Sequence, residues 1–463
     1  MANATRLVRS LSVTDRGQGL VSHAGLVWLG RVADATGLTS GFNTAMAALS
    51  RRRHDPGRTL LQLVLTLADG GMCVSDLAGL RGTGRLFGPV ASVPTAWRSF
   101  NRIGPAELRG LDRAVSAARE VAWRATGEEP AGFVIDLDAT LVTTKADKQD
   151  AAPTWKRTYG HHPLLAMDAA RGEVLAVMLR PGNAGSNTAA DHVVVLGQAL
   201  DALPARERAG HQPGDDPGLV RAEGLVRADA GGASHWLVEE CGDRNLQFSV
   251  GYWIDGRVRD ALLLAQEEDW TPAIGAGGGP RPGAFVQELT GLVALAGWPI
   301  GTRLIVRRER PHPGAQLSLF DDHEGWRHTA FITDQPGEPA ALELRQRQRA
   351  RAENVIRDVK ACGLANLPSD CVVNNDIWAR LAAAALNLLA WARRLTLNGR
   401  LAAATPKTLR YKLLHTAGRL TNGRLDLDHN WPGTTILTQA LDRLAALLPP
   451  PTVTKHRNPQ PTS

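Results

Sequence analysis

The chain has 463 residues, 43% of which are hydrophobic, and its formal net charge at pH 7 is +7. This length is enough for about two to four domains with full hydrophobic cores, and the composition excludes a disordered or low-complexity protein. Most of the positive charge comes from arginine, whose planar side chain binds phosphate well. The charge balance therefore favours an anionic partner such as nucleic acid, but it is a weak signal alone.

The cysteine spacing and the apolar runs indicate the cellular compartment. The four cysteines are Cys73, Cys241, Cys362 and Cys371; their spacing matches no common zinc pattern, so we expect reduced thiols. The first residues do not have the pattern of a signal peptide. The longest apolar runs, at 60–68 and 381–391, are shorter than the ~20 residues that span a bilayer. We expect a cytoplasmic protein with no membrane partner.

Residues 1–125 have a mostly helical pattern and are predicted to form an N-terminal DNA-binding domain. The run at 60–68 predicts a buried segment that ends at Gly70-Gly71. A Ser-Val-Pro-Thr start at Ser92 predicts a helix that carries Arg98 and Arg102 about one turn apart. Such a helix could contact DNA. An ordinary solvated helix face explains the same pattern equally well.

The pattern changes to alternating strands and helices after residue 125. Three β-branched or apolar runs, beginning at Phe133, His162 and Glu173, predict an antiparallel meander. A helix is expected at 187–203, followed by a strand at 225–229, a helix from about 234 and a strand at 247–252. Residues 126–265 are therefore predicted to form the first part of an α/β core, a mixed sheet flanked by helices.

The rest of the chain is predicted to add an insertion and then more helices. Residues 266–338 include a glycine-rich stretch and two strand-like runs, which favours a β-rich insertion. Helical patterns at 339–400 predict the final helices of the core. Residues 401–463 are expected to form a C-terminal helical segment and a disordered tail.

Three acidic residues lie near the ends of predicted strands. Asp136 and Asp138 are two residues apart, so they share one face of the first strand. Carboxylates on an apolar strand are costly to bury without a positive partner, and a divalent metal ion is one such partner. Asp229 ends a later strand, a common position for site residues. Each also has a simpler explanation: pairing with an arginine, a strand cap or a turn before glycine.

A fourth acidic residue, Glu353, lies on a predicted helix. Arg349 precedes it by four residues and Lys360 follows it by seven, so all three share one helix face. A solvated, salt-bridged helix would explain the charges alone. Val355 and Val359 lie among them, however, and indicate a half-buried helix.

These groups suggest a metal-dependent chemistry if the fold brings them together. Asp138, Asp229 and Glu353 could meet at one edge of a mixed sheet. Two metal ions held there ~4 Å apart could activate a water or a 3′-hydroxyl for in-line phosphoryl transfer. Periodicity favours this convergence without proving it.

Several motifs give the sequence a family resemblance. They are Asp136-Leu-Asp-Ala-Thr140, Tyr159-Gly-His-His-Pro, Leu179-Arg-Pro-Gly-Asn, Val226-Arg-Ala-Asp-Ala and Arg349-x3-Glu353-x6-Lys360. With them the chain resembles the DDE transposases of bacterial insertion sequences, and more narrowly the insertion-sequence-1380 group, which is related to the insertion-sequence-4 group. The signature of these enzymes is Tyr-x2-Arg-x3-Glu-x6-Lys, and Gln346 stands here at the tyrosine position.

The resemblance implies a fold and a set of site residues. The fold is an RNase H-like core, with an N-terminal helical domain that recognises DNA ends and a β-strand insertion before the last catalytic helix. Asp138, Asp229 and Glu353 would be the catalytic metal ligands, with Asp136 as the alternative to Asp138. The metal would be Mg²⁺ or Mn²⁺, as two ions. Arg349 and Lys360 would contact DNA phosphates.

The resemblance also implies an activity and its partners. The expected activity is cut-and-paste transposition, in which the protein binds terminal inverted repeats, cleaves the strands and transfers them. The partners would be double-stranded DNA, as transposon ends and target, and a second copy of the chain in a homodimeric synaptic complex. The expected location is the bacterial cytoplasm, at the nucleoid. The alternatives are a catalytically inactive DNA-binding relative and an RNase H-like DNA nuclease.

Overall fold

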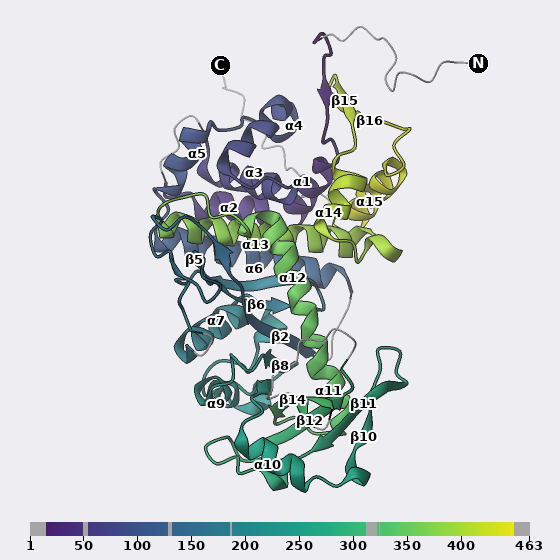
Figure 1. Ribbon diagram of the computed structural model, residues 1–463. Helices are drawn as coiled ribbons and strands as arrows, with labels where there is room; N and C mark the ends of the chain where they lie inside the picture. The colour runs from purple at the N-terminus through teal and green to yellow at the C-terminus, as the bar shows by residue number, and fades with distance from the viewer. Residues whose placement is uncertain are drawn as a thin grey trace, which may run out of the picture.

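The computed structural model describes residues 15–49, 54–127, 132–185, 188–311, 322–323 and 325–448. Figure 1 shows a helical layer at one end, a sheet in the middle and further strands at the other end. The predicted disordered tail after residue 448 lies outside the described residues.

The N-terminal part is helical, as predicted, and its helices begin at recognisable sequence signals. The Asp55 side chain accepts a hydrogen bond from the backbone of Arg58 and so caps the third helix, which Pro56 begins. Glu107 caps the sixth helix by accepting from the backbone of Gly104 at 3.0 Å. The helices are α1 (Leu26–Ala35), α2 (Leu38–Ala45), α3 (Pro56–Ala68), α4 (Gly84–Phe87), α5 (Val93–Phe100) and α6 (Pro105–Ala125).

The predicted mixed sheet is present, and its central strands have the RNase H-like order. The first three of these strands in the chain form an antiparallel meander, and the last two run parallel to the first. Across the sheet the order is β7-β6-β2-β8-β9. In chain order this is third, second, first, fourth and fifth. The strands are β2 (Gly132–Ala139), β6 (Leu164–Asp168), β7 (Glu173–Met178), β8 (Glu223–Ala228) and β9 (Gln247–Tyr252).

Helices cover both faces of this sheet. On one face, Ile135 and Leu137 pack in a buried cluster with α7 (Ala189–Asp201) and α9 (His235–Asp243). On the other face, Leu165 and Met167 belong to a cluster shared with the later helices and the N-terminal helices. The alternation of side chains along β2 therefore places Asp136 and Asp138 on the second face.

The predicted insertion prolongs the core sheet. Its last long strand pairs with β9 in antiparallel fashion, so the sheet continues from β9 to the far edge. The two strand-like runs of the sequence are confirmed, and further strands accompany them. This region contains α10 (Gly256–Leu264), β10 (Thr271–Ile274), β11 (Pro280–Glu288), β12 (Arg303–Glu309), β13 (Asp322–His323) and β14 (Trp326–Thr333).

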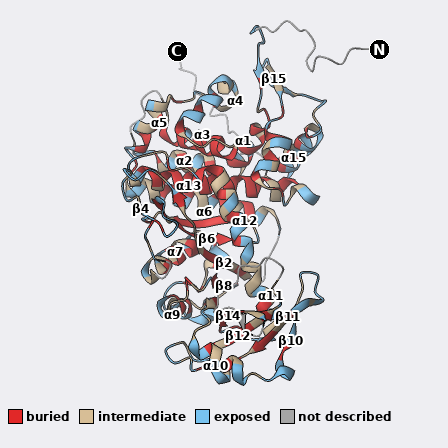
Figure 2. Ribbon diagram, viewed as in Figure 1, coloured by how far each residue is buried: buried red, intermediate tan, exposed pale blue. Residues whose placement is uncertain are grey.

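The chain returns to the core through helices that end in the helical layer. A 3₁₀ turn at Gln348–Ala350 separates the first two of these helices, and a π turn at Lys360–Leu364 ends the second. The long helix α13 is buried along most of its length, as the red ribbon in Figure 2 shows. The helices are α11 (Pro339–Arg347), α12 (Arg351–Val359), α13 (Val372–Thr396), α14 (Pro406–Leu409) and α15 (Thr434–Leu447).

Two small sheets complete the described structure. One is formed by β3 (Val142–Thr143), β4 (Ala152–Pro153) and β5 (Tyr159–His161), beside the ends of the central strands. The other joins β1 (Leu20–Val21) to β15 (Gly418–Thr421) and β16 (Arg424–Leu427), so the two ends of the described chain meet. Among the described helices, none is both long and apolar enough to cross a membrane.

Candidate active site

The first acidic pair lies on the central strand β2, but its two members have different partners. Asp136 is fully buried and receives two hydrogen bonds from Arg227, at 2.7 and 2.9 Å. Arg227 lies directly beside it on the parallel strand β8, because the register pairs the two residues. Asp136 is thus neutralised inside the protein by a bidentate ion pair.

Asp138 lies two residues further along β2 and is partly accessible. Its carboxylate is 3.0 Å from a guanidinium nitrogen of Arg349, and it accepts a hydrogen bond from the backbone of Ala139. Arg349 belongs to the 3₁₀ turn between α11 and α12. The turn therefore brings a cation to the end of the strand.

Asp229 directly follows β8, two residues beyond Arg227, and is exposed. Since β2 and β8 are parallel and pair Asp136 with Arg227, Asp229 follows its strand at the level where Asp138 lies on β2. Its carboxylate accepts a hydrogen bond from the backbone of Gly232 at 3.0 Å. The tight turn into α9 thus fixes the position of Asp229.

Glu353 lies in the first turn of α12 and is exposed. The helix contacts β6 and β7 on the face of the sheet that carries Asp138. Burial raises the pKa of Asp138; the cation of Arg349 opposes this effect, while the negative charges of Asp229 and Glu353 add to it. The three carboxylates predicted as ligands therefore share one electrostatic environment.

The residues at this position fit divalent metal ions. Carboxylate oxygens are the donors that Mg²⁺ and Mn²⁺ prefer. Burial is the main cause of the raised pKa of Asp138, the negative charges of Asp229 and Glu353 add to it, and Arg349 is the cation that pairs with the Asp138 carboxylate. Within the described residues, the three carboxylates are not gathered as tightly as metal ligands, as expected for like charges that repel.

The other residue of the predicted helix face, Lys360, is half-buried. Its ammonium group donates to the backbone oxygen of Leu141 at 2.9 Å, just beyond the end of β2. Burial lowers its pKa, and the nearby charge of Lys156 acts in the same direction. Lys360 thus links α12 to the chain between β2 and the small sheet of β3, β4 and β5.

Gln346, which replaces the tyrosine of the signature, anchors α11 beside Asp229. Its amide nitrogen donates to the backbone oxygen of Ala228 at 3.3 Å. The Arg227 side chain also donates to the backbone oxygen of Arg345. Two hydrogen bonds therefore attach the end of α11 to the end of β8.

Arg98 and Arg102, the predicted DNA contacts of the N-terminal region, are both exposed and lie at and just beyond the end of α5. Arg98 donates to the backbone oxygen of Pro94 and to the Thr95 hydroxyl within its own helix. Neither arginine joins the cluster of carboxylates.

Sequence reasoning missed several residues that surround the site. It left open an arginine partner for Asp136 but did not identify Arg227, because strand register is needed to pair them. It also missed His192 and Arg180 near Asp229. Burial lowers the pKa values of His162 and His192, and the negative charge of Asp229 opposes this effect in both. The Leu179-Arg180-Pro motif was the available signal.

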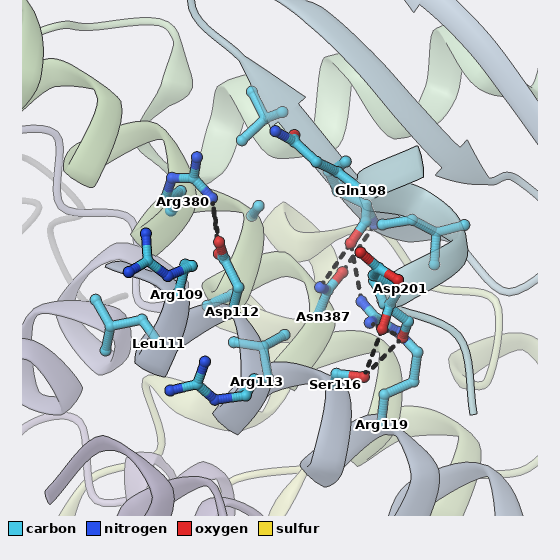
Figure 3. A pocket seen from close by; sticks show the side chains of 18 of the residues that line it. Arg109, Leu111, Asp112, Arg113, Ser116, Arg119, Gln198, Asp201, Arg380 and Asn387 are labelled. Atoms are coloured by element: carbon cyan, nitrogen blue, oxygen red, sulfur yellow. Dashed lines mark hydrogen bonds and ion pairs between the residues drawn. The ribbon is translucent and has the colours of Figure 1, made fainter. Parts of the chain in front are cut away.

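A cavity of about 930 Å³ lies elsewhere, between α6, α7, α13 and β7. Figure 3 shows Asp112 paired there with Arg380, at 2.6 Å, and Asn387 and Arg119 deeper in. Its lining contains none of the candidate metal ligands. The candidate metal ligands therefore lie outside this cavity, at or just beyond the ends of β2 and β8 and on α12.

The order of the central strands defines the fold class of the protein. A mixed sheet in this order, with helices on both faces, is the RNase H-like arrangement. The family model described as Transposase DDE domain group 1 matches residues 4–449, so the chain belongs to this family. DDE transposases act on the phosphodiester bonds of DNA and generally use divalent metal ions.

The chain is also similar to solved structures, one of which is a transposase complex. A piggyBac transposase synaptic complex with hairpin DNA aligns over 92% of this chain and 86% of that chain. The sequence identity is 11% and the TM-score is 0.41. No curated protein matches the chain significantly.

Proposed function

We propose that this protein binds the terminal inverted repeats of a bacterial insertion sequence and moves the element by metal-dependent cleavage and strand transfer. The observation that supports this most directly is geometric: Asp138 and Asp229 lie at the same level on neighbouring parallel strands, and Glu353 lies on a helix that contacts the same sheet. These residues come from two neighbouring strand ends and one helix. Separate contacts fix each position: the Arg349 ion pair for Asp138, the Gly232 hydrogen bond for Asp229, and the packing of α12 on the sheet for Glu353. Family membership supplies the reaction class.

Asp138 serves as the first metal ligand in this proposal, and Asp136 does not. Both oxygens of Asp136 already accept hydrogen bonds from Arg227 in the interior. Asp138 is the member of the pair that reaches the open edge where Asp229 and Glu353 lie. Asp136 then holds β2 and β8 in register, which keeps Asp138 and Asp229 at the same level.

Magnesium or manganese ions, two per site, would activate the attacking water or 3′-hydroxyl and stabilise the leaving oxygen. Asp138, Asp229 and Glu353 would supply the oxygen ligands. Arg349 holds Asp138 through an ion pair, and its guanidinium group would also contact a DNA phosphate. Lys360 fixes the chain after β2 and keeps a positive charge beside the site.

The surface around the small sheet of β3, β4 and β5, next to the site, carries exposed aromatic and basic side chains that suit DNA binding. On the small sheet, Trp155 and Tyr159 are exposed aromatic residues, with 76% and 48% of their area accessible. Lys156 and Arg157 are exposed between them, and the charge of Lys156 acts on Lys360. Exposed aromatic rings among positive charges are suited to DNA bases and phosphates. We place double-stranded DNA along this surface.

The same path reaches the N-terminal helices. Gln149, next to the small sheet, donates to the backbone of Asp370, and Asn374 donates to the side chain of Asn101. Arg98 and Arg102 lie beside that last contact and are placed here as DNA contacts of the transposon end. A homodimer in the synaptic complex, located at the nucleoid, completes the proposal.

Replacing one metal ligand tests the proposed function. We expect Glu353→Gln to abolish cleavage and strand transfer on DNA that carries the element's terminal repeats, with Mg²⁺ present. DNA binding should stay near that of the wild type, because Glu353 is an exposed ligand and not a DNA contact. The exposed Glu239 on α9 provides a matched control, Glu239→Gln, which should be fully active.

Three outcomes would contradict the proposal. Full strand transfer by Glu353→Gln would exclude Glu353 as a ligand. Cleavage without joined products in the wild type would indicate a nuclease. Binding of the repeats without any Mg²⁺- or Mn²⁺-dependent cleavage would indicate an inactive DNA-binding relative.

A further inference from the structure

A second group of potential metal ligands lies far from the carboxylates. His23 precedes α1, Asp69 ends α3, and His415 follows the π turn at Arg410–Leu414. Of the elements around this group, α14 lies in the helical layer and β15 extends beyond it, at the end of the molecule opposite β10 and β11 (Figure 1). The proposed function uses none of the three residues.

The three side chains converge on one point. A nitrogen of His23 lies 2.6 Å from one Asp69 oxygen, and a nitrogen of His415 lies 3.2 Å from the other. The two imidazole rings stack with centroids 4.0 Å apart and planes 13° from parallel. One ligand atom from each residue lies within 4.8 Å of the other two.

The backbone fixes this arrangement from three distant parts of the chain. Ala24 donates to the backbone oxygen of Thr416 at 2.8 Å, next to both histidines, and β1 pairs with β15 just beyond. Arg410 donates to the backbone oxygens of Leu67 and Ala68 at the end of α3. The ligands are thus held by hydrogen bonds that do not depend on the side chains themselves.

The hydrogen bonding of the cluster is incomplete. One Asp69 oxygen, Oδ1, is buried and accepts no hydrogen bond, although the His415 nitrogen is 3.2 Å away. A buried carboxylate oxygen without a donor destabilises the folded protein. A cation bound between this oxygen and the two imidazole nitrogens would remove that cost.

We propose that His23, Asp69 and His415 form a binding site for a transition-metal ion of the Zn²⁺ class. Two imidazoles and one carboxylate are a common ligand set for Zn²⁺, with water in the remaining position. The two histidines are about 40% exposed, with 39% and 38% of their side-chain area accessible, so an ion can enter from solvent. The carboxylate site differs because its donors are all oxygens.

The position of the site gives it a structural role. It joins the segment before α1 and the segment after α14 to the end of α3. The Gly70-Gly71 turn follows Asp69 directly, and the side chain of Arg410 packs against Gly70. A bound ion would therefore stabilise the junction between the two ends of the described chain and the helical layer.

The test uses the full-length, untagged protein, stripped of metal and then titrated with Zn²⁺ or Co²⁺. We expect one ion bound per chain outside the carboxylate site, and a higher Tm when it is bound. His23→Gln and His415→Gln should each weaken binding at least ~10-fold and abolish the Tm shift. A glutamine amide at position 23 can still donate to Asp69, so His23→Gln retains that hydrogen bond and loses the metal ligand.

Two controls separate this site from the proposed function. His429→Gln changes an exposed histidine elsewhere and should bind metal normally. Asp229→Asn removes a carboxylate of the other site and should leave the Zn²⁺-dependent Tm shift unchanged. With Co²⁺, an absorption spectrum typical of nitrogen and oxygen ligands should appear, and His415→Gln should remove it.

Clear results would overturn the inference. They are the absence of bound Zn²⁺ or Co²⁺ in the wild-type protein, or metal binding that both glutamine variants retain. Either result would leave a His–Asp–His contact without metal and would not affect the transposase proposal, which the Glu353→Gln experiment tests separately.

Discussion

At the scale of single residues, the two aspartates of β2 show how neighbouring carboxylates can have different roles. The side chains share one face, yet Asp136 meets Arg227 in the interior and Asp138 meets Arg349 near the open edge. A buried, bidentate pair contributes to the structure of the sheet. A partly exposed carboxylate with like charges nearby contributes to binding cations.

This difference predicts that the asparagine variant of Asp136 loses stability, whereas that of Asp138 loses activity. Asp136→Asn leaves the Arg227 guanidinium buried without its charge partner, so we expect a loss of about 3–5 kcal/mol in the free energy of unfolding. Asp138→Asn should change that free energy by less than about 1 kcal/mol, since the carboxylate is partly exposed, but should abolish DNA cleavage. Urea denaturation measures the free energy of unfolding of both variants, and a cleavage assay measures their activity on DNA. A stable, inactive Asp136→Asn protein would reverse the assignment of the first ligand.

At the scale of elements, α13 protects the edge of the sheet. β7 is the last strand on its side, so its outward backbone groups have no neighbouring strand. The Asn387 side chain on α13 accepts from the backbone nitrogen of Val174 and donates to its oxygen, both at 2.8 Å. One side chain thus takes the place of a strand.

Removing that amide should destabilise the protein strongly. Asn387→Leu would leave the two buried Val174 backbone groups without this partner, at about 1–3 kcal/mol for each unsatisfied group. Arg119 also donates to the Val174 oxygen, so the oxygen keeps a hydrogen-bond partner in the variant and the backbone nitrogen loses its partner. Chemical denaturation should show a loss of about 2–4 kcal/mol, and hydrogen exchange should accelerate at Val174. A loss below about 0.5 kcal/mol would show that the edge does not depend on this amide.

The turn that ends α12 requires a glycine. Gly363 has a φ of +111°, and a Cβ there would lie 2.6 Å from the Leu67 side chain of α3. Gly363→Ala should therefore add backbone strain of about 1–2 kcal/mol and overpacking of about 1–3 kcal/mol. Gly337→Ala is a matched control, because Gly337 has a φ of +119° with no atom within 4 Å. Equal losses of stability in thermal denaturation would show that packing against α3 is unimportant.

The sequence predicted where the helices and strands lie better than it predicted which strands pair with each other. Periodicity and turn residues gave the meander, β8, β9 and the helices because those signals are local. The pairing of Asp136 with Arg227 depends on register between strands that are 91 residues apart, which no local pattern contains. β3, β4 and β5 are two or three residues long, too short for an alternation to be visible.

The sequence offered a set of candidate site residues, but not their arrangement in space. The spacing of Arg349, Glu353 and Lys360 indicated one helix face. In the structure a 3₁₀ turn lies at Arg349 and directs it to Asp138, while Lys360 begins the π turn and binds the backbone of Leu141. The π turn packs against α13 and α3, which lie elsewhere in the chain, so no local pattern could predict this departure from a regular helix.

At the scale of the whole molecule, the N-terminal helices and the core helices share one hydrophobic cluster. It contains Trp28 of α1, Leu63 of α3, Val355 of α12 and Leu388 of α13. The helical layer and the helix that carries Glu353 are therefore joined by buried apolar contacts. Such sharing favours unfolding of both parts together.

This coupling can be tested from a position far from the carboxylates. Trp28 is fully buried and its indole nitrogen donates to the Thr396 hydroxyl of α13 at 3.1 Å. Trp28→Ala should reduce the free energy of unfolding by about 3–5 kcal/mol. Calorimetry should show one unfolding transition at a lower temperature. Hydrogen exchange should then accelerate in α12 and α13 as much as in α1. Trp155→Ala, at a residue 76% exposed, should leave the transition unchanged. Two separate transitions, with α12 still protected in Trp28→Ala, would show instead that the helical layer unfolds independently of the helix that carries Glu353.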